Sequence, residues 1–209
     1  ADVSDPSVVR VGDTYYMTST TMHMNPGVPI MKSTNLVDWE IVNYVYDILA
    51  ASDAQTLSNG QNEYGRGSWA SSLAYHDGVF YVAFSSQTVG KTFIFRTKDI
   101  ENGPWERSII DFTHDMSLLF DDDGRVYLVH GGGDIRVLEL TEDATAIKPG
   151  GLNQVIIPNA SAVVGRSVIL PAEGAHIHKI DGMYYIFLIT WPAGGMRTQI
   201  CFRSASIAG

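Results

Sequence analysis

Short apolar runs, separated by polar and turn-forming residues, recur along the whole chain. Four of them are SVVRV (7–11), TYYMTST (14–20), VFYVAFS (79–85) and MYYIFLIT (183–190). Apolar side chains rarely recur at the three- and four-residue spacing of an amphipathic helix, whereas alternation and short apolar stretches are typical of strands. The pattern therefore predicts an all-β fold built from short antiparallel strands.

One longer pattern repeats four times and indicates the architecture. An apolar strand leads through a glycine-containing turn into an aromatic-rich strand, and polar outer strands such as TNLVDWEIV and ENGPWERSI follow. The copies recur at roughly 45 to 65 residues, which is close to the blade length of a β-propeller. They predict one propeller domain over residues 1–209, with approximate blades at 1–47, 66–112, 113–165 and 171–209.

The fourth copy stops before an outer strand, and an open sheet edge is a feature that natural proteins avoid. We therefore expect a five-bladed β-propeller, of which these residues cover about four blades while the C-terminal part is absent. Whether a further β-sandwich domain follows is left open by the sequence.

Charge and cysteine content restrict the classes of binding partner and the disulfides that this chain can form. The formal net charge of −9 argues against binding to nucleic acid or to an anionic membrane surface, and it leaves a neutral carbohydrate compatible. The single cysteine, Cys201, excludes an intrachain disulfide. We find no apolar stretch long enough for a membrane span and no signal peptide, and the compartment and oligomeric state stay open.

Carboxylates occupy the same place in three of the four copies. Alignment on the turns puts Asp5, Ala70, Asp115 and Glu173 at the start of the innermost strands. These strands line the channel of a propeller, so the three carboxylates are expected to converge there, as acid–base chemistry on a glycosidic bond requires. Each alone could be a turn or loop residue, and the trio could bind Ca²⁺. The run Asp121–Asp123 lacks the spacing of an EF-hand loop and is interpreted as a hairpin turn.

Three segments resemble glycoside hydrolase family 43, which includes β-xylosidases and α-L-arabinofuranosidases. They span residues 4–42, 114–131 and 172–190, and the second has Met116 where the family often has proline. The resemblance implies that Asp5 is the general base, that Glu173 is the general acid, and that Asp115 tunes the pKa of that acid.

The resemblance also implies a sugar pocket. The segment at Trp69 and Ala70 resembles a WAP-like motif with Ser71 in place of proline, and Met22 and His23 replace an aromatic and acidic pair. Trp191 and Arg197 lie in a segment common in the xylosidase and arabinofuranosidase branch. Each of these residues could instead be structural. One of four histidines near the inner strands could also contact sugar or water: His114, His130, His176 and His178.

These features together predict an inverting exo-glycoside hydrolase that releases terminal xylose or arabinofuranose from plant hemicellulose oligosaccharides. An inverting enzyme is expected to hold its base and acid roughly 6.5–9.5 Å apart. Two alternatives remain: an endo-acting arabinanase-type hydrolase, and a non-catalytic propeller that binds carbohydrate. No cofactor is required and no residue of this chain is assigned to a metal, although the resemblance allows a structural Ca²⁺ whose usual ligand comes from a later blade.

Overall fold

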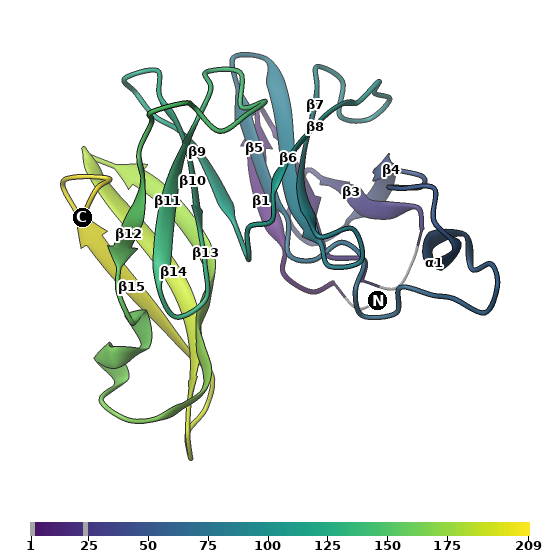
Figure 1. Ribbon diagram of the computed structural model, residues 1–209. Helices are drawn as coiled ribbons and strands as arrows, with labels where there is room; N and C mark the ends of the chain where they lie inside the picture. Colours follow the sequence, from purple (N-terminus) through teal and green to yellow (C-terminus); the bar gives the residue numbers. More distant parts are fainter. Residues whose placement is uncertain (1–2, 23–24) are drawn as a thin grey trace. The chain divides into compact units, whose positions relative to one another are not determined.

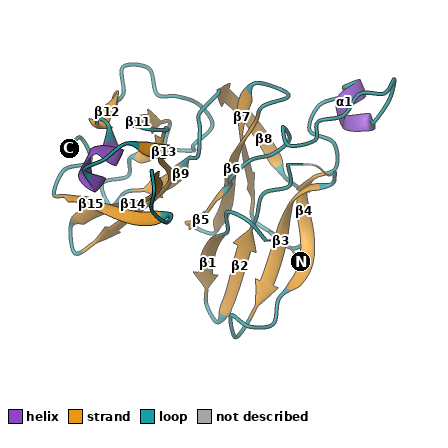
Figure 2. Cartoon of the chain, turned by 90° about the horizontal axis from the view of Figure 1, so that it is seen from below, coloured by secondary structure: helices purple, strands orange, loops and turns teal. Residues whose placement is uncertain are grey.

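The computed structural model describes residues 3–22 and 25–209. Antiparallel strands dominate it, with one short helix, α1 (Asp53–Thr56), and one 3₁₀ helix, η1 (Ala160–Val164) (Figures 1 and 2). In the described residues no helix has the length and apolar character needed to cross a membrane. The predicted all-β fold is confirmed, and the sheets are blades of a β-propeller.

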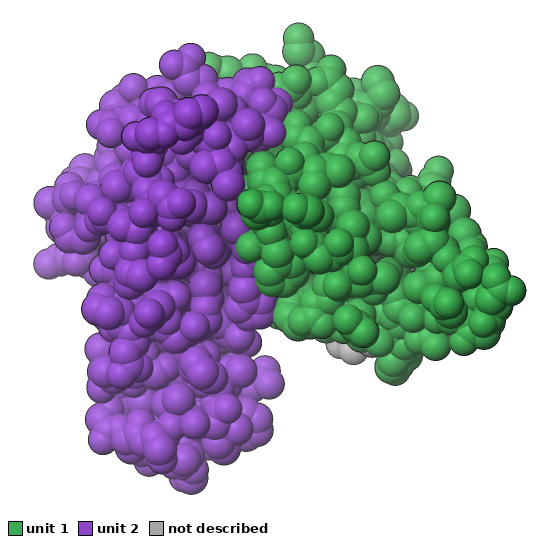
Figure 3. All heavy atoms as spheres, viewed as in Figure 1, with its two compact units in different colours: residues 1–112 green, residues 113–209 purple. Residues whose placement is uncertain are grey.

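The chain forms two compact units, residues 1–112 and 113–209 (Figure 3). The first unit contains two four-stranded sheets, each ordered as the strands occur in the sequence. One sheet consists of β1 (Ser7–Val11), β2 (Thr14–Thr18), β3 (Gly27–Ser33) and β4 (Glu40–Tyr46). The other consists of β5 (Ser72–His76), β6 (Val79–Ser86), β7 (Lys91–Thr97) and β8 (Glu106–Asp111).

The second unit contains a four-stranded and a three-stranded sheet with the same sequential order. The four-stranded sheet consists of β9 (Ser117–Phe120), β10 (Val126–His130), β11 (Ile135–Leu140) and β12 (Asn153–Ile157). The three-stranded sheet consists of β13 (Val168–Ile180), β14 (Met183–Pro192) and β15 (Thr198–Ser204).

Tight turns join the first two strands of each sheet. In two of them an Asp–Gly pair takes positive φ at both residues: Asp77 and Gly78 at +47° and +80°, and Asp181 and Gly182 at +50° and +75°. This is the backbone of a type I′ hairpin, whose twist matches that of the flanking strands. The DG pairs in the sequence thus fix the hairpins that connect β5 to β6 and β13 to β14.

The predicted outer strands begin later than expected, because a side-chain-capped turn precedes them. In the first sheet Asn35 Oδ1 accepts hydrogen bonds from the backbone N–H groups of Val37 and Asp38, both at 2.9 Å. In the second sheet Asp99 Oδ1 accepts in the same way from Glu101 and Asn102. Such Asx turns give the backbone an alternative to ladder pairing, so the strands start only at β4 and β8.

Each unit has its own apolar core between its two sheets. Aromatic rings fill much of the first core, where Phe84 and Phe95 stack with ring centroids 5.7 Å apart. Aliphatic side chains fill most of the second core, including Val129, Val137 and Leu188. The inner strands at which the candidate carboxylates lie are therefore packed against a well-ordered interior.

A buried acid lies in the loop between β4 and β5, beside Gly67. Glu63 is only 4% exposed, and among the described residues neither of its carboxyl oxygens has a hydrogen-bond partner. Burial raises its pKa, and nearby Gln55 and Thr88 oppose this shift in part, although neither meets hydrogen-bond geometry. The first unit thus contains a buried carboxyl group whose pKa lies above its ordinary value.

Candidate active site

Asp115 lies at the end of the loop that enters β9, on a constrained backbone. Its φ is +44°, in the left-handed region that few residues other than glycine adopt and that Asp tolerates. The loop is held on both sides, because Met116 is buried and the backbone carbonyl of His114 accepts a hydrogen bond from Gly131 N at 2.8 Å. Met116 thus takes the place of the family's proline as an apolar anchor. Left-handed residues of this kind cluster at functional sites.

Glu173 projects from β13 at a β-bulge. It pairs with Ile189, whereas His176 pairs with Phe187, so β13 has one more residue than β14 between these two pairs. Gly174 occupies the bulge with φ at +69°. A bulge bends a strand and redirects a side chain, which makes it common beside active sites.

The backbone beside Glu173 is fixed by two hydrogen bonds. Ala172 N donates to Ser161 Oγ at 2.7 Å, and Ala172 O accepts from Gly133 N at 2.9 Å. The second of these bonds connects β13 to the loop after β10. Glu173 therefore projects from a rigid part of the second unit, as a positioned catalytic group requires.

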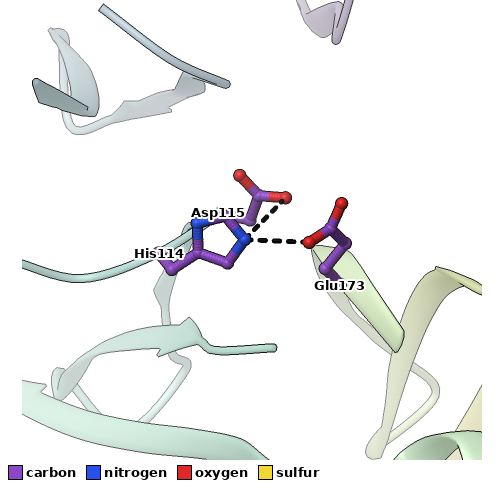
Figure 4. Close-up of side chains that lie close together, drawn as sticks. All are labelled: His114, Asp115 and Glu173. Atoms are coloured by element: carbon purple, nitrogen blue, oxygen red, sulfur yellow. Dashed lines mark hydrogen bonds and ion pairs between the residues drawn. The ribbon is translucent and has the colours of Figure 1, made fainter. Parts of the chain in front are cut away.

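The structure brings Glu173, Asp115 and His114 together (Figure 4). His114 Nε2 lies 2.9 Å from Glu173 Oε2 and 3.7 Å from Asp115 Oδ2. The three side chains are partly exposed, at 29% for His114, 13% for Asp115 and 25% for Glu173. Two carboxyl groups thus share one imidazole in a site that solvent can reach.

The electrostatics of the cluster favour a proton on His114. The hydrogen bond with Glu173 raises its pKa, burial opposes this, and the charges of Asp115 and Glu173 add to the rise. His130 at the end of β10 behaves oppositely: burial, Arg136 and His114 lower its pKa to about 4. The site therefore has one histidine that favours the charged form and one that favours the neutral form.

The same three residues do not form a fitting Ca²⁺ site. Their ligand atoms lie within 4.8 Å of one another, a spacing that a metal ion could bridge. Ca²⁺, however, takes six to eight oxygen ligands, whereas this set offers two carboxylates and a nitrogen. That nitrogen already lies at hydrogen-bonding distance from Glu173. The donor set fits a shared proton better than a hard cation.

Asp5 occupies in the first unit the place that Asp115 has in the second. Its φ is +51°, and it precedes the buried Ser7 by two residues, as Asp115 precedes the buried Ser117. Both serines accept a hydrogen bond from the inner strand of the next sheet: Ser7 Oγ from Leu73 N at 2.9 Å, and Ser117 Oγ from Ile177 N at 3.2 Å. The repeat thus reproduces the backbone, the serine contact and the carboxylate.

Two of the predicted pocket segments lie side by side in the first unit. Met22 O accepts from Gly67 N at 3.1 Å, close to Trp69, whose ring nitrogen donates to Gly65 O at 3.2 Å. Trp69 and Ala70 are half-buried just before β5. His23 lies outside the described residues. The contact supports a common location for Met22 and Trp69, and their role with sugar stays a prediction.

The other predicted pocket residues, Trp191 and Arg197, contact each other in the second unit. The Arg197 guanidinium lies over the Trp191 ring, 5.4 Å from its centroid, and Trp191 Nε1 donates to Gly195 O at 2.9 Å. Trp191 is half-buried near the end of β14 and Arg197 is exposed. The pair is an ordered cation–π contact at the start of the β14–β15 turn.

This is an antiparallel β-propeller with a carboxylate before an inner strand and a carboxyl–imidazole pair beside two others. It belongs to the class of propellers equipped for acid–base chemistry. The chain belongs to the glycosyl hydrolases family 43, whose model matches residues 1–209. It is 31% identical to the beta-xylosidase of Formosa agariphila over 95% of this chain and 34% of that protein. It is 32% identical to a xylosidase/arabinosidase of Butyrivibrio fibrisolvens over 87% of this chain and 36% of that protein.

A solved structure gives the same assignment. The bifunctional GH43-CE protein of Bacteroides eggerthii matches with a TM-score of 0.95 and 51% identity, over 100% of this chain and 27% of that one. The chain spans about a third of the length of the two curated relatives. The predicted family is confirmed.

Proposed function

We propose that the protein is an inverting exo-glycoside hydrolase that releases terminal xylose or arabinofuranose from hemicellulose oligosaccharides. The observation that carries the proposal is the pairing of Glu173 with Asp115 around His114 in a member of family 43. The names of relatives, a beta-xylosidase and a xylosidase/arabinosidase, support the choice of pentose.

The proposed reaction needs one acid and one base. Glu173 transfers its proton to the glycosidic oxygen, the bond from that oxygen to the anomeric carbon breaks, and the electron pair stays on the leaving oxygen. A water molecule attacks the anomeric carbon from the opposite face and gives a proton to Asp5. The products are a free sugar of inverted configuration and an alcohol, and solvent returns the protons to their starting groups.

Asp115 supplies a negative charge beside the acid. We assign to Asp115 the role that the resemblance to family 43 implies, that of a neighbouring charge that tunes the acid. The constrained backbone at Asp115 and the bulge at Gly174 fix the two carboxyl groups relative to each other. This arrangement supports a division of labour in which Glu173 reacts and Asp115 stays ionised.

Hydrolysis of 4-nitrophenyl β-D-xyloside and 4-nitrophenyl α-L-arabinofuranoside by the full-length protein tests the proposal. Glu173→Gln keeps the size of the side chain but has no acidic proton, so we expect its kcat to fall about 100-fold or more. Glu142→Gln, at an exposed position of the same unit, is the matched control and should keep full activity.

The course of the reaction is read by proton NMR of the first product formed. An α-anomer from the β-xyloside supports inversion, and a β-anomer contradicts it. Release of monomers alone from arabinoxylan oligosaccharides supports the exo mode, whereas early oligomers favour the endo alternative. Binding of the oligosaccharides without turnover would overturn the enzymatic proposal.

A further inference from the structure

We propose that His114 is a positioning residue for Glu173: the protonated imidazole holds one carboxyl oxygen of the acid and stabilises the carboxylate that forms when the other oxygen releases its proton. The inference rests on the proposed role of Glu173 as the acid. It gives His114 a function in addition to the three carboxylates on which the proposed reaction depends.

The geometry restricts which oxygen can donate. His114 Nε2 lies 2.9 Å from Glu173 Oε2, at the distance of a charge-assisted hydrogen bond. In Figure 4 the second carboxyl oxygen of Glu173 points away from this contact. Because Oε2 is engaged with an N–H donor, the transferable proton resides on Oε1, which is left to face the leaving group.

The backbone holds the imidazole in this place. The carbonyl of His114 accepts from Gly131 N, and a Cβ atom on Gly132 would lie only 3.4 Å from His114 Cδ2. The ring therefore packs against the glycine segment after β10. The backbone hydrogen bond and the packing of the ring both restrict His114, so little conformational entropy is lost when the ring binds Glu173. The contact can therefore be maintained through the reaction.

The charges around His114 come from four parts of the second unit. Asp115 lies 3.7 Å away on its own loop, and Glu173 faces it from β13. His130 at the end of β10 and Arg136 on β11 complete the set: burial and then the charges of Arg136 and His114 lower the pKa of His130, which favours its neutral form. The imidazolium thus has a second carboxylate beside it, that of Asp115, besides the carboxyl group of Glu173.

Counting protons shows when the pair is competent. With His114 charged and Glu173 neutral, Glu173 can give its proton to the substrate, and the resulting carboxylate is held by the imidazolium. With one proton fewer, the remaining proton is shared between Nε2 and Oε2, and none is available at Oε1. Loss of the first proton from the pair therefore ends activity on the alkaline side. The apparent pKa of this limb belongs to the His114–Glu173 pair and not to either residue alone.

The pH profile of kcat/KM distinguishes this role from a merely structural one. In His114→Gln the positive neighbour is lost while Asp115 remains, so Glu173 should hold its proton to higher pH. We expect the alkaline limb to move to higher pH and the maximal rate to fall. A fall in rate with an unmoved limb, or a limb that moves to lower pH, would overturn the proposal.

The leaving group supplies a second test on the same variant. Xylobiose needs proton donation to its leaving oxygen, whereas 2,4-dinitrophenyl β-xyloside needs little. We expect His114→Gln to lose about 10- to 100-fold in kcat on xylobiose and less than about 3-fold on the dinitrophenyl substrate. Equal losses on both substrates would contradict the proposal. His76→Gln, at a partly exposed histidine that ends β5, is the control and should match the wild type.

A measurement on the unmodified site covers the case in which His114→Gln does not fold. Nitrogen-15 NMR of the histidine rings follows the protonation of His114 in the wild type and in Glu173→Gln. The proposal expects an imidazolium that persists to higher pH than that of His76, and a downward shift in Glu173→Gln. A His114 that titrates below His76 refutes it. A wild type inert on every substrate refutes the proposed function instead, so the two failures are distinguishable.

Discussion

Replacement of Asp121 by asparagine is expected to destabilise the second unit strongly, because this carboxylate is a buried connection between its two sheets. Asp121 follows β9, and its side chain is 1% exposed. Its two oxygens bind Lys179 Nζ at the end of β13 and the Tyr184 hydroxyl at the start of β14. The hairpin turn that the sequence predicts for Asp121–Asp123 is present, and Asp121 adds these buried contacts to it.

The magnitude follows from what the substitution leaves behind. An asparagine amide keeps the shape of the side chain, but it turns an uncharged group towards Lys179, whose side chain is 19% exposed. Breaking one partner of a buried pair costs about 3–5 kcal/mol, since the other charge remains desolvated. We expect Asp121→Asn to lower the free energy of unfolding by that amount.

The neighbouring aspartate supplies the matched control. Asp122 also pairs with Lys179, at 3.1 Å, but its side chain is 86% exposed. Exposed pairs contribute at most about 1 kcal/mol, so Asp122→Asn should change the unfolding free energy by less than that. Urea denaturation of the full-length protein at pH 7, followed by tryptophan fluorescence and circular dichroism, compares the variants. Equal effects of the two substitutions, or a loss below about 1 kcal/mol for Asp121→Asn, would refute the reasoning.

The pH dependence of this contact has a defined sign. Burial tends to raise the pKa of Asp121, but hydrogen bonds from Lys179, Tyr184 and the Asp122 backbone outweigh it, and the pKa is lowered. A depressed carboxyl pKa stabilises the folded state above the unfolded value and loses this effect as the pH falls towards the folded value. The difference between wild type and Asp121→Asn should therefore be full at pH 6 and shrink below about pH 4.

Three further predictions concern the bulge, the serine contact and the buried acid. In Gly174→Ala the new Cβ has room, 3.5 Å from Ile189, but the alanine backbone is forced to φ +69°. We therefore expect urea denaturation to show a stability loss of about 1–2 kcal/mol, and we expect kcat to fall. Ser117→Ala leaves the buried Ile177 N–H unpaired and should cost about 1–3 kcal/mol by the same measurement. With the pKa of Glu63 raised by burial, wild-type stability should fall by up to about 1.4 kcal/mol per pH unit as the pH rises from 4.5 to the folded-state pKa, and Glu63→Gln should remove this slope.

The sequence predicted the fold well because the features that specify it are local. Alternating and apolar runs located the inner strands, and the Asp–Gly pair at Asp77 is a turn signal with a known backbone requirement. The outer strands were placed too early, since Asn35 and Asp99 cap turns that a hydrophobicity pattern does not reveal. Asp121 shows the same limit, because its burial depends on Lys179 and Tyr184, which lie 58 and 63 residues away.

The candidate site was predicted in part, and the reason lies in the bulge of β13. Counting back from the turns, the position equivalent to Ala70 is Gly174, so Glu173 stands one residue before the strict repeat phase. An extra residue between Glu173 and His176 produces this offset, and bulges leave no mark on composition or on periodicity beyond a glycine. The contact between His114 and Glu173, 59 residues apart, depends on that offset and could not be read from spacing. A repeat therefore indicates where carboxylates gather, and a local departure from the repeat adds a contact. Asp5 and Asp115 share a backbone geometry, whereas Glu173 projects from a bulge to lie 2.9 Å from the imidazole that Asp115 approaches to 3.7 Å.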